Sequence, residues 1–152
     1  MEGDLIMMEQ LVVGYLGNGK STNRYHLPFA LNRPETIRVK TIYDRSLSKR
    51  QSPWAVVPGV HYTDDLPEML QDPEIDVIVC TTPVQSHLKL VREILLAGKH
   101  CLLEKPFAMT VSEAKELFAL AKERHLLLEG YQNRRFDSDF LTVQQVIESG
   151  KL

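Results

Sequence analysis

The stretch "VVGYLGNGKSTNRYHLP", residues 12–28, places an apolar strand in front of a glycine-rich turn. Two phosphate-binding patterns overlap in it. Residues 14–21 read G-x-x-x-x-G-K-S, the loop of a nucleoside triphosphatase, and residues 17–22 read G-x-G-x-x-T, close to the G-x-G-x-x-G/A of a dinucleotide-binding fold. Both patterns need a strand, a tight turn and a helix N-terminus directed at phosphate. The rest of the chain has to decide between them.

Short apolar runs alternate with amphipathic segments along the chain. We predict strands at residues 10–16, 37–44, 76–83, 100–106 and 125–131, and helices at residues 64–72, 86–98, 110–124 and 137–150. Strands that are apolar on both faces are typical of parallel sheets covered by helices. Thr110 and Glu113 have capping-box spacing, and Gly98 and Gly150 end two helices. The sequence therefore predicts an α/β fold with a doubly wound parallel sheet of the Rossmann type.

The helix at residues 110–124 should turn one apolar stripe towards the core. Its members are Val111, Ala114, Leu117, Phe118 and Ala121.

Composition narrows the class of protein. The 152 residues carry a net charge of −2 and contain no long Lys/Arg block, which argues against a nucleic-acid partner. No run approaches the roughly 18 apolar residues of a membrane span. Cys80 and Cys101 lie in apolar runs and are interpreted as core residues of a reducing compartment. We therefore expect a cytoplasmic protein, with residues 1–8 as an extension and residues 9–152 as one domain.

The segments after the later strands favour a dinucleotide. A triphosphatase needs an acidic residue after a later apolar strand to hold magnesium, yet the strand at residues 76–80 runs into Thr81-Thr82-Pro83. A dinucleotide fold needs an acid about 20 residues after the glycines, to bind a ribose hydroxyl. Asp44 occupies that position. Gly17 would permit the turn and Gly19 would let the backbone approach a pyrophosphate, although a plain strand-to-helix turn is the alternative for both.

One strand ends in a charged tripeptide. In "GKHCLLEKPFAMT", residues 98–110, Glu104-Lys105-Pro106 would face the ligand crevice at the carboxyl end of a parallel strand. Together with the glycine loop and its "RYHLP", "TTPVQSH" (81–87) and "YQNRRF" (131–136), this tripeptide makes the sequence resemble the Gfo/Idh/MocA oxidoreductase family over nearly the whole chain. The resemblance implies NAD or NADP as the cofactor. It also implies hydride transfer to or from a sugar, an inositol or a related polyol or carbonyl substrate.

The resemblance assigns roles to individual residues. Lys105 would be catalytic, because its ammonium can hydrogen-bond the reacting oxygen and move its proton. Glu104 would hold the nicotinamide ribose. The cofactor-binding residues would be Gly17, Asn18, Gly19, Lys20, Ser21, Thr22, Asp44, Arg45, Thr81, Thr82, Pro83, His87, Glu104 and Lys105. The alternative is a surface lysine at a strand end with Glu104 as its charge partner. The Lys105-Pro106 bond is either cis or trans.

Several of these residues have a structural alternative. Thr81, Thr82 and Pro83 would either support the nicotinamide or form a loop before the next helix, where Ser86 is interpreted as the N-cap. His87 would either lie near the cofactor or be structural.

The residues after the last strand are candidates for the substrate side. These are Gln132, Asn133 and Arg134, and a polar surface loop is the alternative. His26 is given no catalytic role, Trp54 is interpreted as a packing residue, and no cluster predicts a metal.

The choice of cofactor depends on the end of the second strand. Asp44 would accept hydrogen bonds from a free 2′-hydroxyl and repel a 2′-phosphate, which favours NAD. Arg45, Ser46 and Arg50 are residue types that hold a 2′-phosphate. The sequence leans slightly to NAD.

Family members continue into a second α/β domain, which supplies most of the substrate pocket and much of the oligomer interface. The resemblance therefore implies a cofactor-binding half without that domain, an exposed apolar surface, and a homo-oligomer at full length. Such a half should bind a dinucleotide without useful turnover. Two alternatives stay open: a non-catalytic dinucleotide-binding regulatory module, and a nucleoside triphosphatase that uses Lys20.

Overall fold

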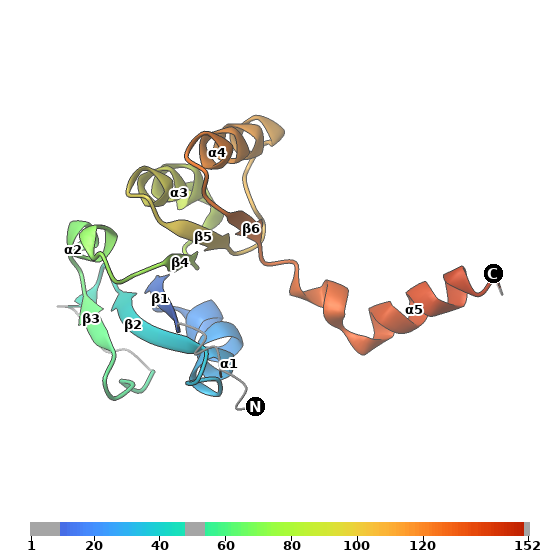
Figure 1. Cartoon of the computed structure of the whole chain (residues 1–152), viewed down its shortest axis with the longest axis horizontal. Coiled ribbons are helices and arrows are strands. Elements are labelled where there is room, and N and C mark those ends of the chain that lie inside the picture. The colour runs from blue at the N-terminus through green and yellow to red at the C-terminus, as the bar shows by residue number, and fades with distance from the viewer. Residues whose placement is uncertain (1–9, 48–53, 151–152) are drawn as a thin grey trace, which may run out of the picture.

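The computed structural model describes residues 10–47 and 54–150, so the extension expected at residues 1–8 and the candidate Arg50 lie outside the described residues. Six parallel strands form one sheet in the order β3-β2-β1-β4-β5-β6 (Figure 1). The strands are β1 (Leu11–Leu16), β2 (Ile37–Tyr43), β3 (His61–Thr63), β4 (Val77–Cys80), β5 (His100–Leu103) and β6 (Leu128–Gly130). This order confirms the predicted doubly wound sheet, and it places the topological switch between β1 and β4.

Helices cover the two faces of the sheet unequally. On one face lie α2 (Leu66–Gln71), α3 (His87–Leu96) and α4 (Val111–Glu123), and on the other lies α1 (Leu27–Leu31), preceded by the π-helical turn η1 (Ser21–His26) (Figure 1). Successive residues of β1 point to opposite faces. Leu16 accordingly packs with the three helices, and Val13 packs in the core that α1 covers.

The N-caps of the helices agree only in part with those predicted from the sequence. The Thr110 side chain caps α4 by accepting the Glu113 amide at 3.2 Å, as its spacing predicts. Ser86 occupies the N-cap position of α3, but its hydroxyl donates to the Pro83 carbonyl at 2.7 Å and caps no helix amide.

The apolar stripe predicted to face the core on α4 includes residues that the structure leaves exposed. Leu117 and Ala121 are buried, whereas Val111 and Phe118 are exposed. The exposed Phe118 ring instead stacks on the Phe107 ring, with the two ring centroids 5.0 Å apart.

Strand β3 was missed from the sequence, and four strands end earlier than predicted, among them β2, which stops at Tyr43 and not at residue 44. β3 is an edge strand of three residues that pairs with residues 41–43 of β2. The strands predicted to run to residues 83, 106 and 131 stop at Cys80, Leu103 and Gly130. The chain leaves the sheet at these points, so the polar residues that follow form loops at its carboxyl edge.

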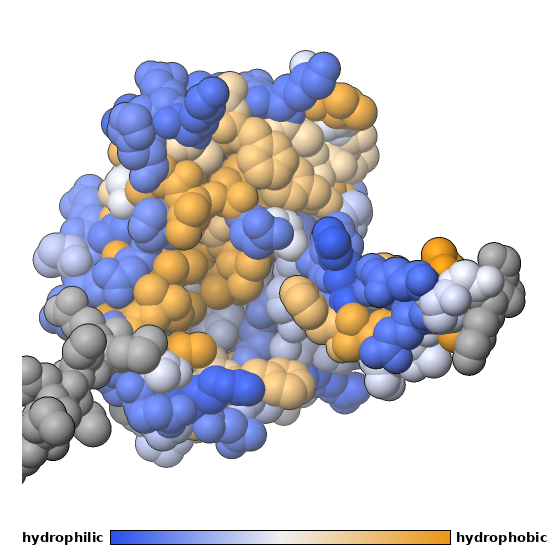
Figure 2. Space-filling view, turned by 45° about the vertical axis from the view of Figure 1, so that its right-hand side comes forward, coloured by the Kyte–Doolittle hydropathy of each residue, from blue (hydrophilic) through white to orange (hydrophobic). Residues whose placement is uncertain are grey.

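The last helix points away from the sheet. α5 (Ser138–Glu148), joined through the 3-10 turn η4 (Asn133–Phe136), projects from the body of the domain and has no buried residue (Figure 1). Its exposed apolar side chains are Phe140, Leu141, Val143 and Ile147. Figure 2 shows a broad hydrophobic surface on the body of the domain facing this helix.

Candidate dinucleotide site

The glycine turn follows β1 directly and is strained for any residue but glycine. Gly17 has a φ of 121°, and a Cβ there would lie 2.6 Å from Thr81 Oγ1. The Gly17 amide donates to the Tyr43 carbonyl at 3.1 Å, which ties the turn to the end of β2. A Cβ on Gly19 would meet nothing within 4 Å, so its backbone faces open space. Lys20 is exposed and Ser21 half-buried at the start of the helix. The turn therefore leaves room for a phosphate group beside a helix N-terminus.

Thr22 stands where the third glycine of the dinucleotide pattern would be. Its side chain is fully buried, and its Oγ1 lies 2.7 Å from the Gly17 carbonyl and 2.8 Å from Thr81 Oγ1. Thr81 Oγ1 also lies within reach of the Leu16 carbonyl, at 3.2 Å. The two hydroxyls thus hold the glycine turn against the end of β4. Direct contact of Thr22 or Thr81 with a cofactor stays a prediction.

Asp44 lies at the end of β2 beside the turn. Its Oδ2 accepts from the Asn18 side-chain amide at 3.2 Å, and its Oδ1 accepts from the Ser46 backbone amide at 3.0 Å. Asn18 Oδ1 in turn accepts from Asn23 at 2.9 Å. The neighbouring Arg45 is exposed. The carboxylate is therefore oriented at the carboxyl edge, next to the glycine turn, where a ribose-binding acid has to lie.

Glu104 and Lys105 follow β5 and have opposite environments. Glu104 is 6% exposed, whereas Lys105 is exposed, with its Nζ 6.0 Å from the centre of the Tyr131 ring. Glu104 Oε2 accepts the Lys105 backbone amide at 3.0 Å, and the Lys105-Pro106 peptide bond is cis. The ammonium is thus free to meet a ligand at this edge, while the carboxylate is held inside.

The structure pairs Glu104 with a side chain that the sequence did not indicate. His26 Nε2 lies 2.9 Å from Glu104 Oε1, and His26 is itself 6% exposed. Its ring also lies against Tyr131, with centroids 4.2 Å apart. Burial lowers the pKa of His26, and the hydrogen bond and charge of Glu104 oppose this shift without reversing it. The contact is therefore a hydrogen bond from a neutral imidazole near neutral pH.

His87 is buried and joins two loops. Its Nε2 lies 2.8 Å from the Thr82 carbonyl and its Nδ1 lies 3.1 Å from the Phe107 carbonyl. Each ring nitrogen thus faces a backbone carbonyl, so His87 lies between the loops after β4 and β5 and positions them. Thr82 Oγ1 lies 2.8 Å from Ser86 Oγ, and Pro83 is exposed. A direct contact of these residues with the nicotinamide stays a prediction.

The substrate-side candidates are only partly grouped with the other residues. Tyr131 belongs to the cluster of His26 and Lys105, but Gln132 and Arg134 are exposed, and Arg134 pairs with Asp137 at 2.6 Å. The half-buried Asn133 has one side-chain oxygen without a hydrogen-bond partner among the described residues.

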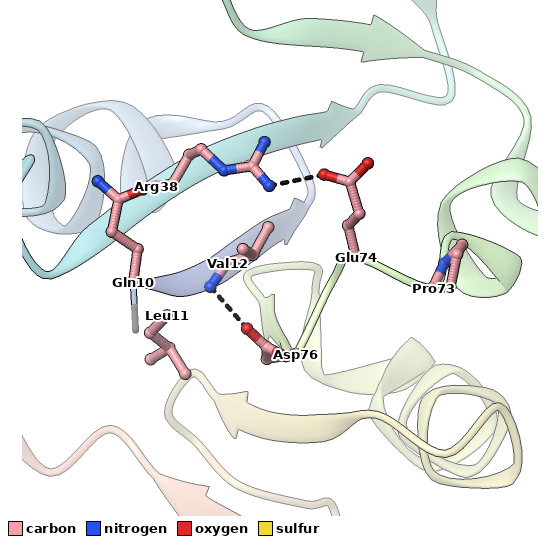
Figure 3. Close-up of a pocket in the computed structure, with 7 residues that line it drawn as sticks. All are labelled: Gln10, Leu11, Val12, Arg38, Pro73, Glu74 and Asp76. Carbon is pink, nitrogen blue, oxygen red and sulfur yellow. Dashed lines mark hydrogen bonds and ion pairs between the residues drawn. The ribbon is translucent and has the colours of Figure 1, made fainter. Parts of the chain in front are cut away.

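A hollow of about 610 Å³ lies at the opposite, amino edge of the sheet (Figure 3). Its polar side chains are bonded to protein groups: Arg38 to Glu74 at 2.7 Å, and Asp76 to the Val12 amide at 2.8 Å. None of the predicted site residues lines it. Ligands of open α/β sheets bind at the carboxyl ends of the strands, so this hollow is not the candidate site.

Residues 10–47 and 54–150 contain neither a candidate metal cluster nor a membrane-spanning helix. No group of three His, Cys, Asp or Glu side chains is placed to hold a metal ion in these ranges. No helix in these ranges is long and apolar enough to cross a membrane.

The strand order, the glycine turn at the topological switch and the oriented acid at the end of β2 define a dinucleotide-binding Rossmann domain. Residues 9–131 match the oxidoreductase family with an NAD-binding Rossmann fold, Gfo/Idh/MocA. The chain belongs to this family. The match supports the dinucleotide interpretation of the glycine loop over the triphosphatase one.

Proteins with a similar sequence are longer than this chain. Oxidoreductase YhhX of Escherichia coli is 48% identical over 138 residues, which are 91% of this chain and 40% of that protein. A crystal structure of yhhX superposes with a TM-score of 0.85 at 46% identity, covering 93% of this chain and 41% of that one. The chain thus spans about 40% of the length of this relative.

Two relatives have assigned activities. The scyllo-inositol 2-dehydrogenase (NADP(+)) IolW of Bacillus subtilis is 35% identical over 95% of this chain and 39% of its own length. KijD10, a 3-ketoreductase from Actinomadura kijaniata crystallised with NADP, superposes with a TM-score of 0.80 at 26% identity, over 93% of this chain and 43% of that chain.

Proposed function

We propose that this chain is the cofactor-binding part of an oxidoreductase that moves a hydride between a nicotinamide dinucleotide and a sugar, an inositol or a related polyol. The family match supports the dinucleotide, and the names of IolW and KijD10, an inositol dehydrogenase and a ketoreductase, support a substrate with hydroxyl or keto groups. The nicotinamide supplies the hydride chemistry when it is bound. The residues of this chain bind and orient it and handle the proton.

The exposed Lys105 beside a buried Glu104 is the observation that carries the proposal. Parallel strands bring the loop after β5 to the same edge as the glycine turn after β1, and the contact between His26 and Glu104 joins the two directly. The Lys105 ammonium donates a hydrogen bond to the reacting oxygen of the substrate. In oxidation the unprotonated amine of Lys105 takes the proton of the substrate hydroxyl, and in reduction the ammonium returns that proton to the carbonyl oxygen.

We propose NAD as the preferred cofactor. Asp44 is held at the end of β2 by Asn18 and by the Ser46 amide, so its charge stays where a 2′-phosphate would otherwise lie. The exposed Arg45 next to it is the residue that would favour NADP instead.

A titration of the purified 152-residue chain with NADH, NADPH and Mg-ATP, followed by nucleotide fluorescence and thermal shift, tests the proposal. Saturable binding of NADH that Gly19→Val abolishes is the expected result, because a side chain there would fill the open space without disturbing the protein around it. Lys115→Ala, on the exposed side of α4, is the control and should bind as the unaltered chain does. Binding of Mg-ATP alone would overturn the proposal.

The role of Lys105 needs the whole protein. In the corresponding full-length enzyme, Lys105→Met should abolish turnover of polyols while NADH affinity changes little. Turnover that survives this change would remove Lys105 from the proton transfer.

A further inference from the structure

A buried histidine from the first helix reaches the loop that carries the lysine. His26 ends η1, nine residues after Gly17, in the segment that follows β1. Glu104 and Lys105 follow β5, which is separated from β1 in the sheet by β4. His26 Nε2 and Glu104 Oε1 lie 2.9 Å apart with both side chains buried. The proposed function assigns no role to this histidine.

The chemistry of the contact fixes which group donates. A carboxylate only accepts hydrogen bonds, so a neutral imidazole has to carry its proton on Nε2 to make this contact. The other carboxylate oxygen, Oε2, accepts the Lys105 amide at 3.0 Å. One carboxylate thus links the His26 ring to the backbone of Lys105.

The surroundings of the ring leave it little freedom. Tyr131 packs on it at 4.2 Å between centroids, and Tyr15 meets it edge-on at 6.1 Å. The same Tyr131 ring lies 6.0 Å from Lys105 Nζ. His26 therefore contacts both groups that surround Lys105, the Glu104 carboxylate and the Tyr131 ring.

We propose that His26 is a positioning residue that holds Glu104, and through it Lys105, in the orientation that the dinucleotide site requires. The inference rests on the proposed function for its consequence, which is cofactor affinity through Glu104, the residue expected to hold the nicotinamide ribose. Its structural half, the control of the Lys105 backbone by His26, stands apart from any ligand. If His26 acts in this way, cofactor binding depends on a hydrogen-bond donor at position 26 and not on a charge.

Two substitutions separate these requirements. His26→Leu removes the donor and keeps an apolar side chain, whereas His26→Gln keeps an N–H donor that can reach Glu104. The first measurement, which needs no ligand, is the NMR shift and hydrogen-exchange protection of the Lys105 amide. We expect His26→Leu to change the shift and lower the protection by about tenfold or more, and His26→Gln to restore most of both.

The second measurement is the affinity for NADH. We expect His26→Leu to weaken it by about tenfold and His26→Gln to recover most of that loss. In a Glu104→Leu background, the further change His26→Leu should have almost no effect, because the group through which His26 acts is already absent. The double variant also replaces both buried partners by apolar groups, which favours folding.

His61→Leu is the matched control. His61 Nε2 lies 3.0 Å from Glu68 Oε1, a pair of the same kind that is exposed and lies at β3, the edge of the sheet opposite β5 and β6. It should leave the Lys105 amide and NADH affinity unchanged.

Each outcome decides the matter. An unchanged Lys105 amide in folded His26→Leu would overturn the inference, as would a loss of NADH affinity that Gln fails to rescue. If the unaltered chain binds no nicotinamide nucleotide, the proposed function falls. The Lys105 amide still shows in that case whether His26 positions the loop.

Discussion

The side-chain oxygens of Thr22 and Thr81 lie 2.8 Å apart and join the first helix to the end of β4. Thr22 Oγ1 also donates to the Gly17 carbonyl at 2.7 Å. A glycine at position 22 would let the helix approach the sheet but would supply neither bond. At position 22, the hydrogen bonds of a threonine hydroxyl therefore replace the close backbone packing that a glycine allows, and they hold the glycine turn in place.

Removing this hydroxyl should destabilise the domain. Thr22→Val keeps the shape of the side chain but leaves buried polar groups without a partner, at a cost of about 1–3 kcal/mol in the free energy of unfolding. Urea denaturation followed by circular dichroism measures the change. Thr142→Val is the control, because its hydroxyl bonds the Ser138 carbonyl on the exposed helix α5 and its loss should cost little. Equal losses of unfolding free energy in the two variants would show that the Thr22 hydroxyl does not hold the glycine turn.

The two glycines of the turn should respond differently to alanine. Gly17→Ala places a Cβ 2.6 Å from Thr81 Oγ1 at a φ of 121°, and should lower the free energy of unfolding by about 1–3 kcal/mol. Gly19→Ala enters open space and should change stability by less than about 0.5 kcal/mol. It should nevertheless weaken NADH binding. Thermal unfolding with and without NADH compares both effects, and a stable Gly17→Ala would show that the turn is not strained.

Stability should fall below neutral pH because of His26. In the folded state, burial is the largest effect on the pKa of His26 and lowers it. The hydrogen bond and charge of Glu104 raise this pKa, and the charge of Lys105 lowers it, so that the net shift is downward. The unfolded state, whose histidine has a pKa of about 6.5, then binds protons more readily. The stabilising contribution is full above about pH 6.5 and is lost as the pH falls towards the lowered value.

The measurement is the free energy of unfolding at about pH 7.5 and about pH 5.5, compared with that of His26→Gln. We expect a smaller decrease on acidification in the variant, which has no imidazole to protonate. Tyr131 and Tyr15, which also face the ring, stay neutral throughout this range because burial raises both pKa values. A larger decrease in the variant would reverse the sign of the proposed effect.

Both cysteines should be unreactive in the folded protein. Cys80 and Cys101 are free and buried, and burial raises the pKa of each thiol. A chromogenic disulfide reagent should label neither within the time that labels both in urea. Rapid labelling of one thiol under native conditions would indicate local opening of β4 or β5.

Asp44 should control the choice between cofactors. Asp44→Ser removes the charge that repels a 2′-phosphate, and we expect the ratio of NADPH to NADH affinity to rise by about tenfold. The fluorescence of each nucleotide titrated into the chain measures this ratio. Glu123→Gln, an exposed residue at the end of α4, is the control for a change in net charge. An unchanged ratio would assign the choice to other residues, with Arg45 as the first to test.

Local pattern predicted the parallel sheet and most helices, because buried strands and amphipathic helices leave a period in the sequence. The edge strand β3 reads His-Tyr-Thr, which is too short and too polar to show such a period or an apolar run. Val111 and Phe118 lie at the margins of an apolar stripe, where periodicity does not separate buried from exposed positions. The contact of His26 with Glu104 joins residues 78 positions apart, so only the folded sheet reveals it. The same holds for Thr22 and Thr81.

The amino edge of the sheet offers a route to a more robust protein. Arg38, Glu74 and Asp76 bond there to one another or to the strand starts, in a hollow that is distant from the loops after β1, β2 and β5 (Figure 3). An engineer could fill this hollow with larger apolar side chains to raise the melting temperature. The candidate dinucleotide site lies at the other edge of the sheet, so such changes should escape the usual trade-off between thermal robustness and activity.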